Sequence, residues 1–211
     1  MKNKSTTSAS TTEPVVLTTE AERQAERHLI KVDPIMARLV TTHGPCTISM
    51  KEFVPFQTLV TSIISQQLST KAADTIQQRV LARASAFTPT GLLALSTETL
   101  RSAGLSGAKA RYILELSSRV VDGRLDFNAL TNLSDELVIN TLTEIPGIGK
   151  WTAEMFLIFG LKRANVLTTG DAALRRAVRA LYGNDQTLER VGQAWHPYCS
   201  VASWYLWRQL A

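Results

Sequence analysis

One stretch of the chain, "LTEIPGIGKWTAEM", combines a glycine-rich turn with residues that could bind an anion. Glycine permits a sharp turn and lets a ligand approach the backbone. The first amides of the helix that follows lack intrahelical partners, and they favour negative charge. We expect a nucleic-acid phosphate to bind Gly147, Gly149, Lys150 and Thr152, with both glycines required. The alternative is a helix–helix turn whose glycines serve geometry alone.

A carboxylate follows this turn at a fixed distance. Asp171 lies twenty positions beyond Trp151, after Gly170 and before a helical stretch. Asp is a favoured N-cap residue, which is a sufficient structural reason for its presence. A carboxylate at a helix N-terminus can also face whatever the turn holds, so the two interpretations are compatible. From residue 141 to 182 the chain has six basic and three acidic residues, which favours an anionic ligand.

The composition is that of a globular protein with a basic surface. Of 211 residues, 45% are hydrophobic and 19% charged, with a net charge of +5. This balance favours nucleic acid or a membrane surface as partner. Two cysteines are too few for a disulfide framework or a four-cysteine cluster, which favours a reduced intracellular protein. We see no signal peptide and no apolar run of the roughly 20 residues that a membrane-spanning helix needs.

Apolar residues recur at helical spacing along almost the whole chain, and we find no convincing strands apart from a short extended piece at "CTISM". The first helix is expected to break at Asp33-Pro34, and the next to end at Gly44. We predict an all-α protein of roughly ten helices, built as two lobes with a cleft between them. Residues 1–17 read as a disordered Ser/Thr-rich tail, 18–211 as the domain, and 142–156 as its hairpin.

These segments resemble the helix-hairpin-helix–Gly/Pro–Asp signature of DNA base-excision glycosylases. The match runs through "LTEIPGIGKWTAEMFLIFGL" and "VLTTGDAALRRAVRALYG". Within that superfamily the chain is similar to the 3-methyladenine DNA glycosylase II group, with "FQTLVTSIISQQLSTKAA" and "GLSGAKARYILELS" in matching order. The resemblance implies extrusion of a damaged nucleotide into a pocket between helical lobes, and hydrolysis of its base–sugar bond. Asp171 would then stabilise the positive charge that develops on the sugar.

The resemblance also assigns other positions. An alkylated purine is already a cationic leaving group, so no strong general acid is needed, and we see no second carboxylate placed for that role. Aromatic faces would bind the cation instead. The implied base pocket contains Gln66, Trp151, Met155 and Trp207, although core packing is the simpler interpretation of Trp207. Gln67, or alternatively Leu68, would fill the gap in the base stack. Backbone carbonyls would hold a sodium or potassium ion at Thr143, Ile145 and Ile148; no other cofactor is implied.

Trp151 decides the expected reaction type. Bifunctional members of the superfamily carry a nucleophilic lysine in this position, whereas Lys150 occupies the neighbouring one. We therefore expect a monofunctional hydrolase without lyase activity. Its partner would be double-stranded DNA containing alkylated bases, with no membrane, and the protein would act as a monomer. The alternatives are a catalytically weak damage-binding module, a glycosylase for another lesion class, or an all-α protein–protein adaptor.

Overall fold

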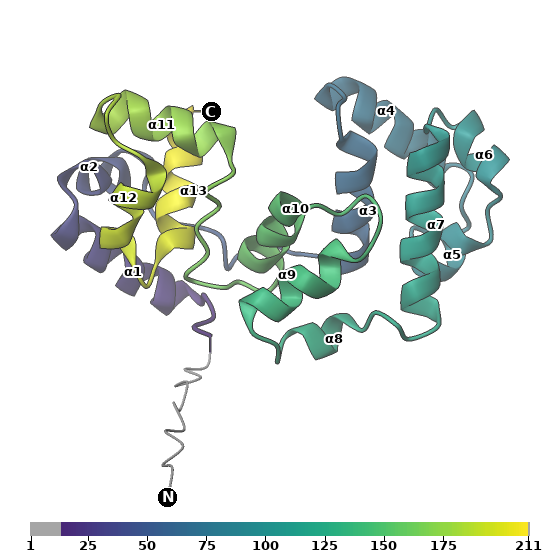
Figure 1. Cartoon of the computed structure of the whole chain (residues 1–211), viewed down its shortest axis with the longest axis horizontal. Coiled ribbons are helices and arrows are strands. Elements are labelled where there is room, and N and C mark those ends of the chain that lie inside the picture. Colours follow the sequence, from purple (N-terminus) through teal and green to yellow (C-terminus); the bar gives the residue numbers. More distant parts are fainter. Residues whose placement is uncertain (1–13, 211) are drawn as a thin grey trace, which may run out of the picture.

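The computed structural model describes residues 14–210, which form helices joined by short loops (Figure 1). Within this range the all-α prediction is confirmed, with thirteen α-helices rather than roughly ten. Two shorter turns add to them: a π-helical turn, η1, and a 3₁₀ turn, η2. In chain order the elements are α1 Thr19–Val32, α2 Pro34–His43, α3 Pro55–Ser65, α4 Thr70–Leu81, α5 Pro89–Leu93, α6 Thr97–Ser102, α7 Gly107–Val121, α8 Phe127–Leu130, α9 Asp135–Thr143, α10 Lys150–Met155, η1 Phe156–Gly160, α11 Ala172–Tyr182, α12 Leu188–Gly192, η2 Gln193–Trp195 and α13 Cys199–Leu210.

The helices form two groups, as the sequence predicted. The first and last parts of the chain pack together, because α13 contacts α1, α2 and α11. The middle of the chain forms the second group, in which α7 packs against α3, α5 and α6. Helix α10 lies between the two groups in Figure 1 and packs against α9. None of the helices in residues 14–210 is long and apolar enough to cross a membrane.

Local sequence signals account for several boundaries. Asp33 ends α1 and caps α2, with Pro34 in the first turn, and Gly44 at φ 70° ends α2. The apolar face predicted in α3 is buried, from Phe56 to Ile64. The "CTISM" segment ends in a turn. One expectation was wrong, because the domain begins before residue 18.

The chain is already bound to the domain at residue 15. The Ala164 amide donates to the Val15 carbonyl at 2.9 Å, and the Leu17 amide donates to Lys162 at 2.6 Å. The Leu17 side chain is buried. The predicted tail is therefore too long by at least these residues, because three consecutive apolar residues (15–17) between polar segments show no helical spacing. The rest of that prediction, residues 1–13, lies outside the described residues.

Candidate active site

Asp171 begins α11 and is almost fully buried, with 6% of its surface exposed. Its Oδ1 accepts the Leu174 amide at 2.8 Å, which is the N-cap bond expected from the sequence. Its own amide donates to the Thr168 carbonyl at 3.0 Å, so the preceding turn fixes the backbone. The carboxylate therefore lies at the positive end of an eleven-residue helix.

Two indoles complete the surroundings of this carboxylate. Trp151 of α10 donates from Nε1 to Asp171 Oδ2 at 2.7 Å, and Trp207 of α13 donates to Oδ1 at 3.4 Å. Trp207 is half-buried, and its ring lies 5.8 Å from that of Phe159. Trp151 is 49% exposed, so an open aromatic face lies beside a buried carboxylate. The three elements therefore meet at one anionic group, and Trp207 belongs to the site as well as to the core.

Glu154 is a second buried carboxylate that sequence reasoning missed. It lies one turn after Lys150, whose Nζ is 3.8 Å from it. Burial raises the pKa of Glu154, the Lys150 charge lowers it, and the negative charge of Asp171 raises it further. Nothing in "KWTAEM" shows which face of so short a helix is buried, so the signal was not available. No described contact places Glu154 against a reacting group.

The hairpin glycines differ from each other in what the fold requires of them, while the expectation that phosphate binding needs both stays a prediction. Gly147 has φ 88°, and a Cβ there would lie 2.4 Å from a ring carbon of Tyr112. Gly149 has φ −91°, and a Cβ there would meet nothing within 4 Å. Only Gly147 is required for folding by this geometry. Gly149 caps α10 without a side-chain hydrogen bond, so the first amides of α10 have no side-chain cap.

Two residues of α10 that lie two positions apart, Lys150 and Thr152, differ in exposure. The Lys150 side chain is 71% exposed and available to an anion. Thr152 is buried, and its hydroxyl lies 3.3 Å from the Ser62 hydroxyl on α3. Thr152 can therefore contact DNA through its backbone amide but not through its side chain. The hydroxyl pair instead joins α10 to α3.

The segment between α3 and α4 faces the hairpin. Gln66 donates from Nε2 to the Gly147 carbonyl at 2.6 Å, so its amide joins segment and hairpin. Gln67 has φ 58° and is exposed, as is Leu68. Both side chains that were proposed to enter the base stack are thus free to do so, and the choice between them stays a prediction. Gln66 does not line the cavity described next, and its expected place in the base pocket stays a prediction.

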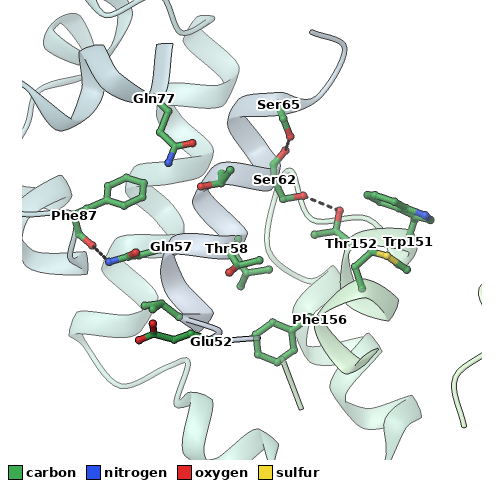
Figure 2. A pocket seen from close by; sticks show the side chains of 14 residues that line it. Glu52, Gln57, Thr58, Ser62, Ser65, Gln77, Phe87, Trp151, Thr152 and Phe156 are labelled. Carbon is green, nitrogen blue, oxygen red and sulfur yellow. Dashed lines mark hydrogen bonds between the residues drawn. The ribbon is translucent and has the colours of Figure 1, made fainter. Parts of the chain in front are cut away.

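A cavity of about 530 Å³ opens between α3 and α10 (Figure 2). Trp151, Met155 and Phe156 are among the residues that line it, whereas Asp171 and Trp207 are not. The assignment of residues to a base pocket stays a prediction. Phe87 forms part of the wall, and Gln57 donates to its carbonyl at 3.2 Å. Trp151 therefore connects the cavity to the Asp171 site, because it lines the cavity while its N–H donates to Asp171. The volume is in the range of small-molecule sites.

The cavity lining has almost no charged residues. Fourteen residues line the cavity, and Glu52 is the only charged one among them. No lysine, arginine or histidine contributes, so the cavity does not suit a phosphate or a carboxylate ligand. Apolar and aromatic walls with amide and hydroxyl groups suit a flat heterocycle that is neutral or cationic.

Comparison with known proteins supplies the family. Residues 60–195 match the model of the HhH-GPD superfamily base excision DNA repair protein. The chain belongs to this superfamily. A DNA-3-methyladenine glycosylase of Schizosaccharomyces pombe is 32% identical over 88% of this chain and 86% of its own length. An alkylbase DNA glycosidase-like protein of the same yeast is 27% identical over 88% of this chain and 92% of its own.

Solved structures agree with these relatives. A DNA-3-methyladenine glycosidase from Bacillus halodurans superposes with a TM-score of 0.77 at 39% identity, covering 87% of this chain and 88% of that one. A 3-methyladenine DNA glycosylase of Schizosaccharomyces pombe in complex with abasic DNA gives 0.74 at 32% identity, covering 88% and 95%. The superfamily and the 3-methyladenine glycosylase group inferred from the sequence are thereby confirmed.

Proposed function

We propose that the protein is a monofunctional DNA glycosylase that releases alkylated, cationic bases such as 3-methyladenine and 7-methylguanine from double-stranded DNA. The observation that carries this proposal is Asp171, a buried N-cap carboxylate bound by the indoles of Trp151 and Trp207. The alkylation-repair class is supported by the names of the relatives that span most of the chain. The individual lesions are part of the proposal.

The chemistry follows from the position of the carboxylate. When the damaged nucleotide leaves the stack, its C1′ approaches Asp171 and its base stacks on the exposed face of Trp151. The bond between C1′ and the base nitrogen breaks, and the electron pair leaves with the base. Asp171 stabilises the positive charge on the sugar until water adds at C1′ and loses a proton. The products are a free base and an abasic site.

The cavity beside Trp151 supports selection for a cationic base. Its lining offers aromatic faces and one carboxylate, and attraction between a cation and an aromatic ring contributes about 0.5–2 kcal/mol per contact. No cationic side chain lines the cavity to repel such a base. A neutral purine stacks there without this attraction, which gives a preference for alkylated bases.

Water, rather than an amine, is the proposed nucleophile. Trp151 fills the position of the nucleophilic lysine, and its N–H is bound to Asp171. The ammonium of Lys150 lies on the Glu154 side of α10, 3.8 Å from that carboxylate. An amine attack from Lys150 would require it to leave this position and pass Trp151. Borohydride should therefore trap no covalent complex with DNA.

The hairpin is proposed to hold a DNA phosphate on the uncapped amides of α10, next to exposed Lys150. A bound sodium or potassium ion would be held by the carbonyls of Thr143, Ile145 and Ile148 and would supply a further positive charge. The fit is partial. Thr143 ends α9, where carbonyls lack helical partners. Ile145 already accepts the Ile148 amide at 3.0 Å and keeps one lone pair.

Gly149→Asp tests the phosphate contact without straining the turn. Its carboxylate can cap α10, so the melting temperature should stay level or rise. The same carboxylate should occupy the amides and repel phosphate, which weakens binding to damaged and undamaged duplexes alike. Gly149→Ala is the matched control, since the site has room for a Cβ. Unchanged affinity in Gly149→Asp would mean that the hairpin is only a structural turn.

The decisive experiment for the activity is base release from duplex oligonucleotides that carry one defined lesion each. We expect release of 7-methylguanine and 3-methyladenine, and little release of 8-oxoguanine or uracil. Tight binding to alkylated duplexes with no free base would favour the damage-binding alternative. Release of oxidised bases only would favour a different lesion class. Gel filtration with and without DNA checks the proposed monomer.

A further inference from the structure

The segment that joins α3 to α4, residues 66–68, is held in an unusual conformation. Gln67 adopts φ 58°, in the left-handed region that side chains other than glycine seldom occupy. Such a conformation persists only when neighbouring groups fix it, and it is common where the backbone has a functional task. The Leu68 amide donates to the Ser65 carbonyl at 3.1 Å, which closes the turn on one side.

Lys109 on α7 supplies the constraint from the other side. Its Nζ donates to the Ile64 carbonyl at 2.7 Å and to the Gln66 carbonyl at 2.6 Å. Both carbonyls lie at the end of α3, where the last carbonyls lack helical partners and a cation is favourable. Partial burial lowers the pKa of Lys109, as expected for an ammonium turned toward the protein. Two of its three donors are therefore used within the molecule.

The same face of α7 also supports the hairpin. Tyr112 lies one turn beyond Lys109, and its ring packs so closely on Gly147 that a Cβ there would be 2.4 Å away. Gln66 then joins the two supported segments through its bond to the Gly147 carbonyl. One turn of α7 thus contacts both elements that face DNA, and it fixes the distance between them.

We propose that Lys109 is a positioning residue that holds residues 66–68 in the conformation from which Gln67 or Leu68 enters the base stack. This inference rests on the proposed glycosylase function. It assigns Lys109 a role inside the protein, although a basic residue beside a DNA-facing turn would ordinarily be assigned to phosphate binding. The two roles differ in what they do to affinity and to base extrusion.

Lys109→Met tests the inference, because it keeps the aliphatic stem and removes the ammonium. Single-turnover base release is measured on two duplexes, one with the lesion opposite a normal base and one with the lesion opposite an abasic site. Extrusion is easier in the second, where the lesion has no pairing partner. We expect release from the paired duplex to fall at least tenfold, and release from the second to fall much less. Lys31→Met, an exposed charge on α1, is the control for the loss of one charge.

The salt dependence of binding to undamaged duplex separates the alternative role. A lost phosphate contact lowers the slope of log K against log salt by about 0.9. It would also reduce base release from both lesion duplexes by the same factor. We expect the slope of Lys109→Met to equal that of the wild type. A reduced slope, or equal loss on both duplexes at unchanged slope, would overturn the inference. If the wild type itself releases no base, the proposed function fails instead.

Gln66→Met gives a second test if Lys109→Met does not fold. It removes the bond to the Gly147 carbonyl while leaving both Lys109 bonds in place. Single-turnover base release from the paired duplex should again fall more than release from the duplex with the abasic site opposite the lesion. Equal rates on the paired duplex for Gln66→Met and wild type would overturn the link between segment and hairpin.

Discussion

Asp33 and Asp171 begin different helices with almost the same set of contacts. Each is 6% exposed, each caps its helix through Oδ1, and each binds a tryptophan N–H through Oδ2. Asp33 receives Trp195 at 2.8 Å and the Tyr182 hydroxyl at 2.6 Å. Burial, and then the hydrogen bond to Asp33, raises the pKa of Tyr182. The local chemistry of the two carboxylates is therefore nearly identical.

The difference lies in the donors. Trp195 is fully buried and lies 6.2 Å from the Tyr182 ring, so the Asp33 cluster is closed on itself. Trp151 has half of its surface exposed and also lines a cavity. A buried N-cap carboxylate is thus a structural element unless one of its partners opens to a ligand. We therefore expect the proposed function of Asp171 to depend on the exposed indole of Trp151 as well as on the carboxylate.

Replacing Asp171 should give the largest change in activity. Asp171→Asn keeps the cap, because Asn and Asp are similar N-cap residues, but removes the negative charge. We expect single-turnover base release to fall by roughly 10²–10³-fold, the loss typical for one group that stabilises developing charge. Binding to duplex DNA and the melting temperature should change little. Release at the wild-type rate would remove Asp171 from the mechanism.

Asp33→Asn should show the opposite pattern. Its single side-chain oxygen can keep the helix cap, but its NH2 group then faces the buried Trp195 indole and cannot accept from it. An unpaired buried donor costs about 1–3 kcal/mol. In a domain of this size the melting temperature should fall by roughly 2–4 °C for each kcal/mol. Base release per folded molecule should stay near wild type at a temperature below the transition. A loss of activity as large as that of Asp171→Asn would mean that the comparison between the two clusters is wrong.

A pair of indole replacements sharpens the comparison. Trp151→Phe keeps a ring but removes the 2.7 Å bond to Asp171 and weakens cation attraction. We expect base release to fall about tenfold with little change in stability, since water can replace the donor at an exposed position. Trp195→Phe should lower the free energy of unfolding by about 1–3 kcal/mol while leaving release intact. Thermal melts and single-turnover assays of both variants measure these two effects. If both variants lost the same stability and the same activity, the distinction between the Asp33 and Asp171 clusters would be wrong.

The sequence was enough to predict that Asp171 caps a helix, because an N-cap depends on residues close together in the chain. The catalytic role of Asp171 and the pocket role of Trp151 came from the resemblance and stay predictions. The break at Asp33-Pro34 followed from the same local rules. Long-range packing decided what it could not predict. The resemblance named Trp207 and Gln66, but the sequence did not give their partners: Trp207 donates to Asp171 across 36 positions, and Gln66 donates to the Gly147 carbonyl. Periodicity gives the face of a helix that is buried but not the partner it meets.

The surroundings of Glu154 were hidden for a related reason. Helix α10 has six residues and passes directly into the π-helical turn η1, which shifts the register of the following side chains. An α-helical wheel drawn through both segments therefore misplaces their faces. Only the folded structure shows that Glu154 is buried near Asp171, and this carboxylate supports a prediction of smaller size.

Glu154→Gln should stabilise the protein slightly at neutral pH. Burial raises the pKa of Glu154 above its unfolded value, so ionisation at pH 7 opposes folding. Gln removes that cost, and the loss of the ion pair with exposed Lys150 matters little. The melting temperature of the variant should exceed that of the wild type at pH 7, and the difference should shrink as the pH falls through the raised pKa and Glu154 becomes neutral. Exposed Glu144→Gln is the control and should show no such gain. A difference in melting temperature that grows toward acid pH would mean that the fold lowers the pKa of Glu154 and stabilises its carboxylate, which would contradict this prediction.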